Sequence, residues 1–151
     1  FFKQKTAYEM LRSLVGSEMC IETAIHQRWA ADEHLVALIP PERFVTGLGT
    51  DARLPYGVLN TSAFVPMVRY NDRSGIDSVT LRVDCFHQQY QQAVAAADRI
   101  RAVFDRAALP LGDGSEALLR FVGCHLRQEE QGTWHLRAKL ECWLYRPAPA
   151  V

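Results

Sequence analysis

The sequence lacks an excess of either charge, and it lacks a long apolar run. Lysine plus arginine number 17 and aspartate plus glutamate also number 17, so the formal net charge at pH 7 is zero. A nucleic-acid-binding domain usually carries a basic excess that neutralises phosphates, and a membrane helix needs about 20 consecutive apolar residues. The composition therefore predicts a domain with no specificity for nucleic acid and no membrane partner.

The sequence also lacks the compact motifs that mark metal sites and catalytic centres. Its four cysteines, Cys20, Cys85, Cys124 and Cys142, form no C-x-x-C pair, and its five histidines show no H-E-x-x-H spacing. No serine lies in a G-x-S-x-G elbow, and no glycine pair completes a G-x-G-x-x-G motif or a P-loop. We therefore expect buried reduced cysteines, exposed histidines, no metal, no cofactor and no catalytic residues. Catalysis by residues that are distant in the sequence remains the alternative.

One pair of residues suggests a nucleophile with its base. Cys85 and His87 are two positions apart, a spacing that places both side chains on one face of a strand. A reactive thiol needs an accessible and electropositive setting. Because Cys85 ends an alternating run that points Val79 and Val83 inward, we favour an inert core thiol.

What the sequence does contain is enough apolar material for one folded domain. Hydrophobic residues make up 48% and charged residues 23% of the 151 positions, the ordinary balance of a globular domain.

Apolar positions from Ile21 to Trp29 recur every three to four residues, which predicts an amphipathic helix. Asp32 is placed to cap a second, short helix. Residues 56–68 are β-rich, and Pro66 favours a sheet edge.

The central part changes its hydrophobic period. Val79 to Cys85 alternates apolar and polar residues, which predicts a strand with one buried face. From about His87 to Ala108 the period becomes helical, and Pro110 and the glycines after it end this long helix.

The last two segments predict a hairpin, since their apolar faces must align. A three-residue loop, Glu130 to Gly132, places glycine at the left-handed position that such loops favour. In that register Val122 opposes Leu140, Cys124 opposes Ala138, Leu126 opposes Leu136 and Leu118 opposes Leu144, while His125 faces Arg137 and His135 faces Arg127 on the outer side. The fold class is then α+β, a mostly antiparallel β-sheet with one long and one shorter helix packed on one face.

Residues 1–20 have a character of their own. They resemble translated sequencing-adapter read-through, so we expect them to be a non-native extension, with the domain at 21–146 and a C-terminal tail at 147–151. The alternative is a genuine amphipathic helix, because one helical face roughly holds Tyr8, Leu11, Leu14 and Val15.

Four segments follow one another in an order that carries a family resemblance. They are IETAIHQRWAADEHLVALIP, LPYGVL, DSVTLRVDCFHQQYQQAVAAADRIRAVFDRAAL and LLRFVGCHLRQEEQGTWHLRAKLECWLY. Their order and spacing, over Ile21 to Tyr145, resemble the tail completion, or tail terminator, family of siphophage-type tails and prophages. Leu54-Pro55-Tyr56, the strand from Thr80 to Phe86 and the helix from Ala97 to Asp105 carry most of the likeness.

The resemblance implies a structural protein of the virion tail, assembled in the bacterial host cytoplasm. Its partners would be further copies of itself in a six-fold ring, the tail-tube protein and the head-tail connector protein, and it would have no catalytic residues. Such a ring would cap the tube, end its polymerisation and join the tail to the head. A neighbouring head-tail joining protein and a small-ligand-binding accessory domain, with its pocket between the long helix and the sheet, remain alternatives.

The segment from Asn71 to Gly75 predicts a turn, and a group of large side chains beside it provides the candidate interface. An exposed group of this kind marks a contact surface, and we select Phe64, Met67, Arg69, Tyr70 and Arg73. The alternative is that Phe64 and its apolar neighbours Val65 and Val68 belong to the core.

Overall fold

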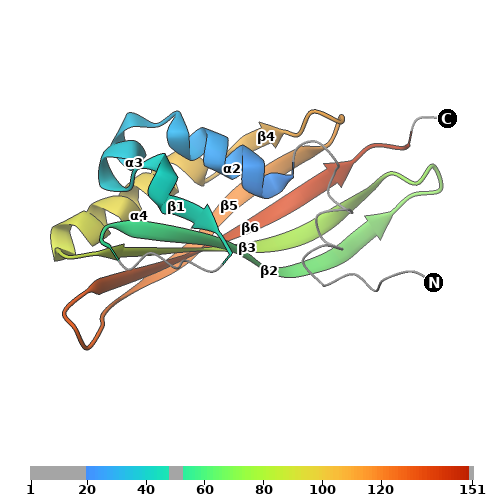
Figure 1. Cartoon of the computed structure of the whole chain (residues 1–151). Coiled ribbons are helices and arrows are strands. Elements are labelled where there is room, and N and C mark those ends of the chain that lie inside the picture. The colour runs from blue at the N-terminus through green and yellow to red at the C-terminus, as the bar shows by residue number, and fades with distance from the viewer. Residues whose placement is uncertain (1–19, 48–52, 150–151) are drawn as a thin grey trace, which may run out of the picture.

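The protein is a long, curved β-sheet with helices on one of its faces (Figure 1). The computed structural model describes residues 20–47 and 53–149, so the predicted extension lies outside the described residues except for Cys20. The elements in chain order are α2 (Ile21–Ala30), α3 (Glu33–Leu38), the 3-10 helix η1 (Pro41–Arg43), β1 (Phe44–Thr46), β2 (Tyr56–Arg69), β3 (Gly75–His87), α4 (Tyr90–Phe104), β4 (Ala108–Pro110), β5 (Glu116–Gln128) and β6 (Trp134–Arg146).

The sheet has six strands in the order β1-β2-β3-β6-β5-β4. β1 runs parallel to β2, and the other neighbouring strands pair antiparallel. A mostly antiparallel sheet covered by helices was predicted, and the sheet is mixed because one pair of neighbouring strands, β1 and β2, is parallel. β1 ends at Thr46 and β2 begins at Tyr56, so the connection is longer than the two-residue hairpin that can join antiparallel strands.

The helices are held together by aromatic packing and by one strong ion pair. Trp29 of α2 is fully buried, stacks on Phe44 with ring centroids 4.0 Å apart, and donates its indole N–H to the carbonyl of Ile39 over 2.9 Å. Asp32 caps α3 as predicted, accepting from the amide of Leu35 over 2.9 Å. Asp32 also receives Arg99 of α4, so one carboxylate joins two helices.

The long helix α4 is shorter than its predicted range of 87–108. It ends at Phe104, and Arg106 turns the chain with a left-handed φ of 63°. Ala108–Pro110 then forms strand β4 against β5 instead of a last helical turn. The carbonyl and amide of Leu119 bond to Arg106 and Ala107, so strand pairing outcompetes the helical tendency of the alanines.

The hairpin of β5 and β6 confirms part of the predicted register. Gly132 adopts a left-handed φ of 88°, and Cys124 opposes Ala138 and Leu126 opposes Leu136 as predicted. The pairs Val122 with Leu140 and Leu118 with Leu144 are wrong. A β-bulge between Phe121 and Gly123 shifts the remaining rungs by one residue, so Phe121 faces Leu140 and Ala117 faces Leu144.

The inner face of the sheet is the core. Val83, Cys85, Leu136 and Leu140 are all fully buried beneath the helices. The bulge has a consequence on the opposite face, because it turns Leu118 outward, where it is 49% exposed. The face that no helix covers is called the outer face below.

Candidate interaction surfaces

The predicted interface residues lie on the arm formed by the ends of β2 and β3. Met67 is 51% and Tyr70 53% exposed, and the side chains of Arg69 and Arg73 are also exposed. Phe64 differs, because it is partly buried and packs against the core. The alternative that assigned Phe64 to the core is therefore correct for this one residue.

The arm is fixed to the sheet through a buried carboxylate. Asp77 is completely buried, and its oxygens lie 2.6 Å from Arg69 and 3.5 Å from Arg146. The Arg69 contact is a close charge contact whose angles are not those of a hydrogen bond. A buried carboxylate requires such partners, so Arg69 is committed to its own chain and is a poorer candidate for partner contact than Tyr70 or Arg73.

The turn at the tip of the arm, residues 70–74 (the β2–β3 turn), is internally ordered. The amide of Tyr70 donates to the carbonyl of Ser74, and the amide of Arg73 donates to the carbonyl of Tyr70, each over 3.0 Å. Asp72 accepts from the hydroxyl of Ser74 over 2.6 Å and from its amide over 2.9 Å. These bonds hold the pKa of Asp72 below its ordinary value. The exposed side chains of the turn are therefore presented by a rigid frame.

The outer face carries apolar side chains at the end near this arm. Strand register aligns Val65, Ser78, Trp143 and Leu118 in one row across β2, β3, β6 and β5. The side chains of Val65, Trp143 and Leu118 are 54%, 52% and 49% exposed. A contiguous exposed apolar group of this kind typically contacts another protein.

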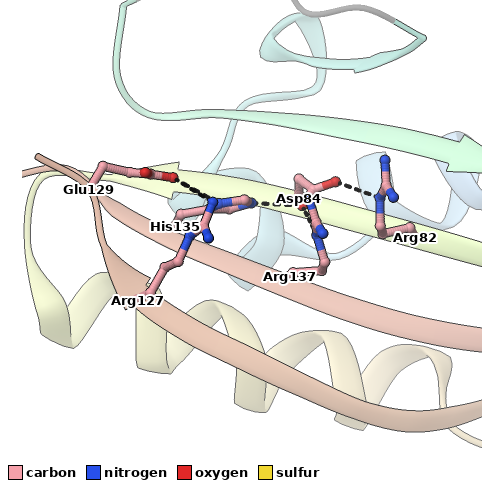
Figure 2. Close-up of polar contacts among 6 residues, drawn as sticks. All are labelled: Arg82, Asp84, Arg127, Glu129, His135 and Arg137. Atoms are coloured by element: carbon pink, nitrogen blue, oxygen red, sulfur yellow. Dashed lines mark hydrogen bonds and ion pairs between the residues drawn. The ribbon is translucent and has the colours of Figure 1, made fainter.

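Toward the turn of the β5–β6 hairpin the outer face becomes polar. The polar side chains there surround a buried pair, Asp84 and His135 (Figure 2). The Nε2 atom of His135 lies 2.7 Å from Asp84 Oδ1, and its Nδ1 atom lies 3.0 Å from Glu129 Oε1. Arg137 donates to Asp84 over 2.9 Å, and Arg82 does so over 3.1 Å. An imidazole that meets a carboxylate at each nitrogen is held in one orientation.

Two opposing effects act on the pKa of Asp84 in this network. Burial alone would raise the pKa of Asp84, but hydrogen bonds from His135 and Arg137 outweigh it and hold the pKa below its ordinary value. The ring of His135 also stacks on Phe86 at 4.3 Å, and Phe86 stacks on Tyr56 at 4.6 Å. The cluster thereby joins β2, β3 and β6 beside the turn of the hairpin.

The sequence predicted only part of this cluster. His135 faces Arg127 and His125 faces Arg137 as expected, but His135 is buried rather than exposed. Asp84 was missed because it lies 51 residues from His135. The only signal was its outward position in the alternating strand, where a lone acid two residues after Arg82 could have indicated a partner.

A groove of about 400 Å³ lies at the edge of β5, beside the row of apolar side chains. Its lining includes Asp105, Arg106, Leu118, Phe121 and Trp143. The Oδ1 atom of Asp105 accepts from the amide of Phe121 over 2.9 Å, which satisfies one backbone group of the open strand edge. This groove is called the β5 groove below.

Two thiols and one histidine that could carry chemistry are buried. Burial raises the pKa of Cys85 above its ordinary value and raises that of Cys142 to about 12, so both thiols are inert as predicted. His87 is also fully buried, which lowers its pKa, so the prediction of an exposed histidine is wrong here. Cys124 corrects the prediction in the other direction, because it is exposed.

Within residues 20–47 and 53–149, no three histidine, cysteine, aspartate or glutamate side chains are grouped to hold a metal ion. The helices in this part of the chain are all too short or too polar to span a membrane.

The sheet is covered on one side by helices and bears exposed apolar and charged side chains on the other, an arrangement suited to contacts with other proteins. The model of the family described as tail completion protein gp17 matches residues 23–145, so the chain belongs to this family and is a structural component of phage-type tails. The resemblance predicted from the sequence is thereby confirmed.

Solved structures share the fold. One comes from the virion of a native gene transfer agent particle, with a TM-score of 0.65, 14% identity, and coverage of 83% of this chain and 95% of that chain. A second, whose description states no function, has a TM-score of 0.56, 10% identity, and coverage of 96% and 100%. No curated protein sequence matches the chain.

Proposed function

We propose that this chain is the subunit of a ring that caps the tail tube, ends its polymerisation and joins the tail to the head connector. The ring is six-fold, forms in the bacterial host cytoplasm and remains in the virion tail. Membership of the tail completion family supports a role in the tail. The observation that supports assembly into a ring is that the two opposite edges of the sheet bear different exposed surfaces.

A closed ring requires this arrangement, because each subunit must contact its two neighbours through different patches. The β2–β3 turn lies toward the β1 edge of the sheet, and the β5 groove lies toward the β4 edge. The part of the apolar row that lies outside the groove, where Val65 is exposed on β2, offers a surface for the tube or the connector. Each proposed contact thus has a separate place on the molecule.

The experiment uses the full chain with the tail-tube protein encoded beside it. Light scattering would measure the mass of the chain alone and with the tube protein, and electron microscopy would measure tube lengths. We expect an assembly with six times the 17.1 kDa mass of one chain, together with shortened tubes of uniform length.

A chain that stays monomeric in both conditions and leaves tube length unchanged would refute the proposal. A ring that forms but binds only the head connector would instead favour the neighbouring head-tail joining role.

A further inference from the structure

Two arginines in the described chain adopt a left-handed backbone, and each lies at one of the two surfaces. Arg73 in the β2–β3 turn has a φ of 70°, and Arg106 beside the β5 groove has a φ of 63°. Arginine gains nothing intrinsic from this conformation, which is uncommon for residues other than glycine, asparagine and aspartate. Such residues cluster at functional positions, so both sites invite a common explanation.

Each of these arginines follows an aspartate, which gives the two surfaces matching charge pairs. The turn presents Asp72 and Arg73, and the groove presents Asp105 and Arg106. Neither Arg73 nor Arg106 forms an ion pair with another residue of the described chain. If the turn enters the groove with its chain direction reversed, each arginine meets the aspartate of the other surface.

The apolar parts of the two surfaces also match. Tyr70 is 53% exposed beside Arg73, while Leu118 and Trp143 form the exposed apolar wall of the groove. An aromatic ring entering an apolar groove with arginine beside it is the usual composition of a strong interface contact. The hydrogen bonds within the turn order it in advance, which reduces the entropy lost on binding.

We infer that the β2–β3 turn of one copy inserts into the β5 groove of the next copy, with Tyr70 against Trp143, Arg73 paired with Asp105, and Asp72 paired with Arg106. The inference rests on the proposed ring function and names its contact. Because turn and groove lie on different strands of one sheet, the contact is heterologous and can repeat around a ring.

The experiment places one cysteine on each surface and asks which copies can be linked. Cys124 is an exposed thiol, so Cys124→Ser provides the background for Tyr70→Cys and, in a second protein, Trp143→Cys. A short bifunctional maleimide reagent is added to each protein alone and to their equal mixture under conditions where the assembly forms. We expect covalent dimers in the mixture and none with either protein alone.

A chain carrying both cysteines should give a ladder of products that ends at the size of the ring. The matched control pairs Trp143→Cys with Tyr90→Cys, because Tyr90 is also exposed, at 51%, but belongs to α4. The control should give no ladder.

The possible results separate the inference from the function. Rings without cross-links in the mixture would overturn the inference alone, because the ring must then use other surfaces. Cross-links within each single variant would also overturn it, since they indicate a two-fold contact. Monomers throughout would overturn both this inference and the proposed function.

A second pair of variants tests the charges without removing the apolar contact. Arg73→Gly and Arg106→Gly suit the left-handed backbone and should leave the fold intact. Because an exposed ion pair contributes little, each should raise the concentration needed for assembly by only about two- to fivefold. An unchanged assembly concentration in both variants would refute the proposed charge pairing.

Discussion

At the scale of single residues, Asp32 shows how one side chain can carry two structural tasks. It caps α3 and also receives a two-pronged contact from Arg99, whose Nη2 lies 2.5 Å from Asp32 Oδ2. Chiefly because of the Arg99 hydrogen bonds, and against the effect of burial, the pKa of Asp32 falls from its ordinary 3.8 to about 2. The carboxylate therefore stabilises the contact between α3 and α4 only while it is charged.

The direction of this pKa shift predicts acid sensitivity. The folded state holds the proton less tightly than the unfolded chain, so the stabilisation is complete above about pH 4 and is lost as the pH falls toward 2. We expect Asp32→Asn to lower the free energy of unfolding at pH 7 by about 1 kcal/mol after allowance for solvent screening. Urea unfolding at several pH values should show this difference vanish in acid.

The neighbouring residue supplies the control for this measurement. Glu33 is exposed on the first turn of α3, so Glu33→Gln should change stability much less. A deficit for Asp32→Asn that is the same at pH 7 and at pH 2.5 would show that charge is not the cause.

At the scale of elements, the β5–β6 hairpin depends on backbone conformation in its turn and on charge beside that turn. Gly132 has a φ of 88°, and an added Cβ would meet only the side chain of Gln128, at 3.9 Å. Space is therefore available, and the cost of a side chain would come from the backbone alone. Beside the turn, the pairing of Asp84 with His135 joins the hairpin to β3.

We expect Gly132→Ala to lower the free energy of unfolding by about 1 kcal/mol, because alanine in the left-handed region is strained. Gly123 provides the control, since it lies in the same hairpin without a positive φ and with no atom within 4 Å of an added Cβ. Gly123→Ala should leave stability nearly unchanged or raise it slightly. Chemical unfolding of the two variants would decide, and equal losses would exclude the backbone explanation.

The same hairpin shows what a sequence can and cannot predict. Its loop followed from one glycine, and its first rungs followed from the apolar alternation. The bulge at Val122 could not be predicted from the sequence. Apolar residues occur at successive positions of β5 around it, so the registers with and without the extra residue both give an apolar inner face. Because the bulge was not predicted, the outward position of Leu118, which forms part of one wall of the β5 groove, was not predicted either.

At the scale of the whole molecule, the inner and outer faces of the sheet differ in how far they can be predicted. The buried face repeats apolar residues at every second position, so the fold class follows from local patterns. The outer face depends on strand order, which brings Asp84 beside His135 and aligns Val65 with Leu118. Contacts between residues so distant in the chain have no local signal.

The extent of the domain leads to a last prediction. The family match begins at residue 23, and α2 begins at Ile21, with Cys20 as its N-terminal flanking residue. Cys20 is 6% exposed, belongs to the core and lies 3.3 Å from the hydroxyl of Thr23. The proposed non-native extension therefore has a boundary that can be tested one residue at a time.

We expect deletion of residues 1–19 to leave Tm unchanged, if these residues are foreign to the domain. Deletion of residues 1–20 should lower Tm by about 4 °C, because it removes a buried thiol that contributes about 1 kcal/mol, and a domain of this size shifts by about 4 °C per kcal/mol. Differential scanning calorimetry of both chains would measure the two effects. A large loss from the first deletion would show instead that residues 1–19 form the amphipathic helix that their apolar spacing permits.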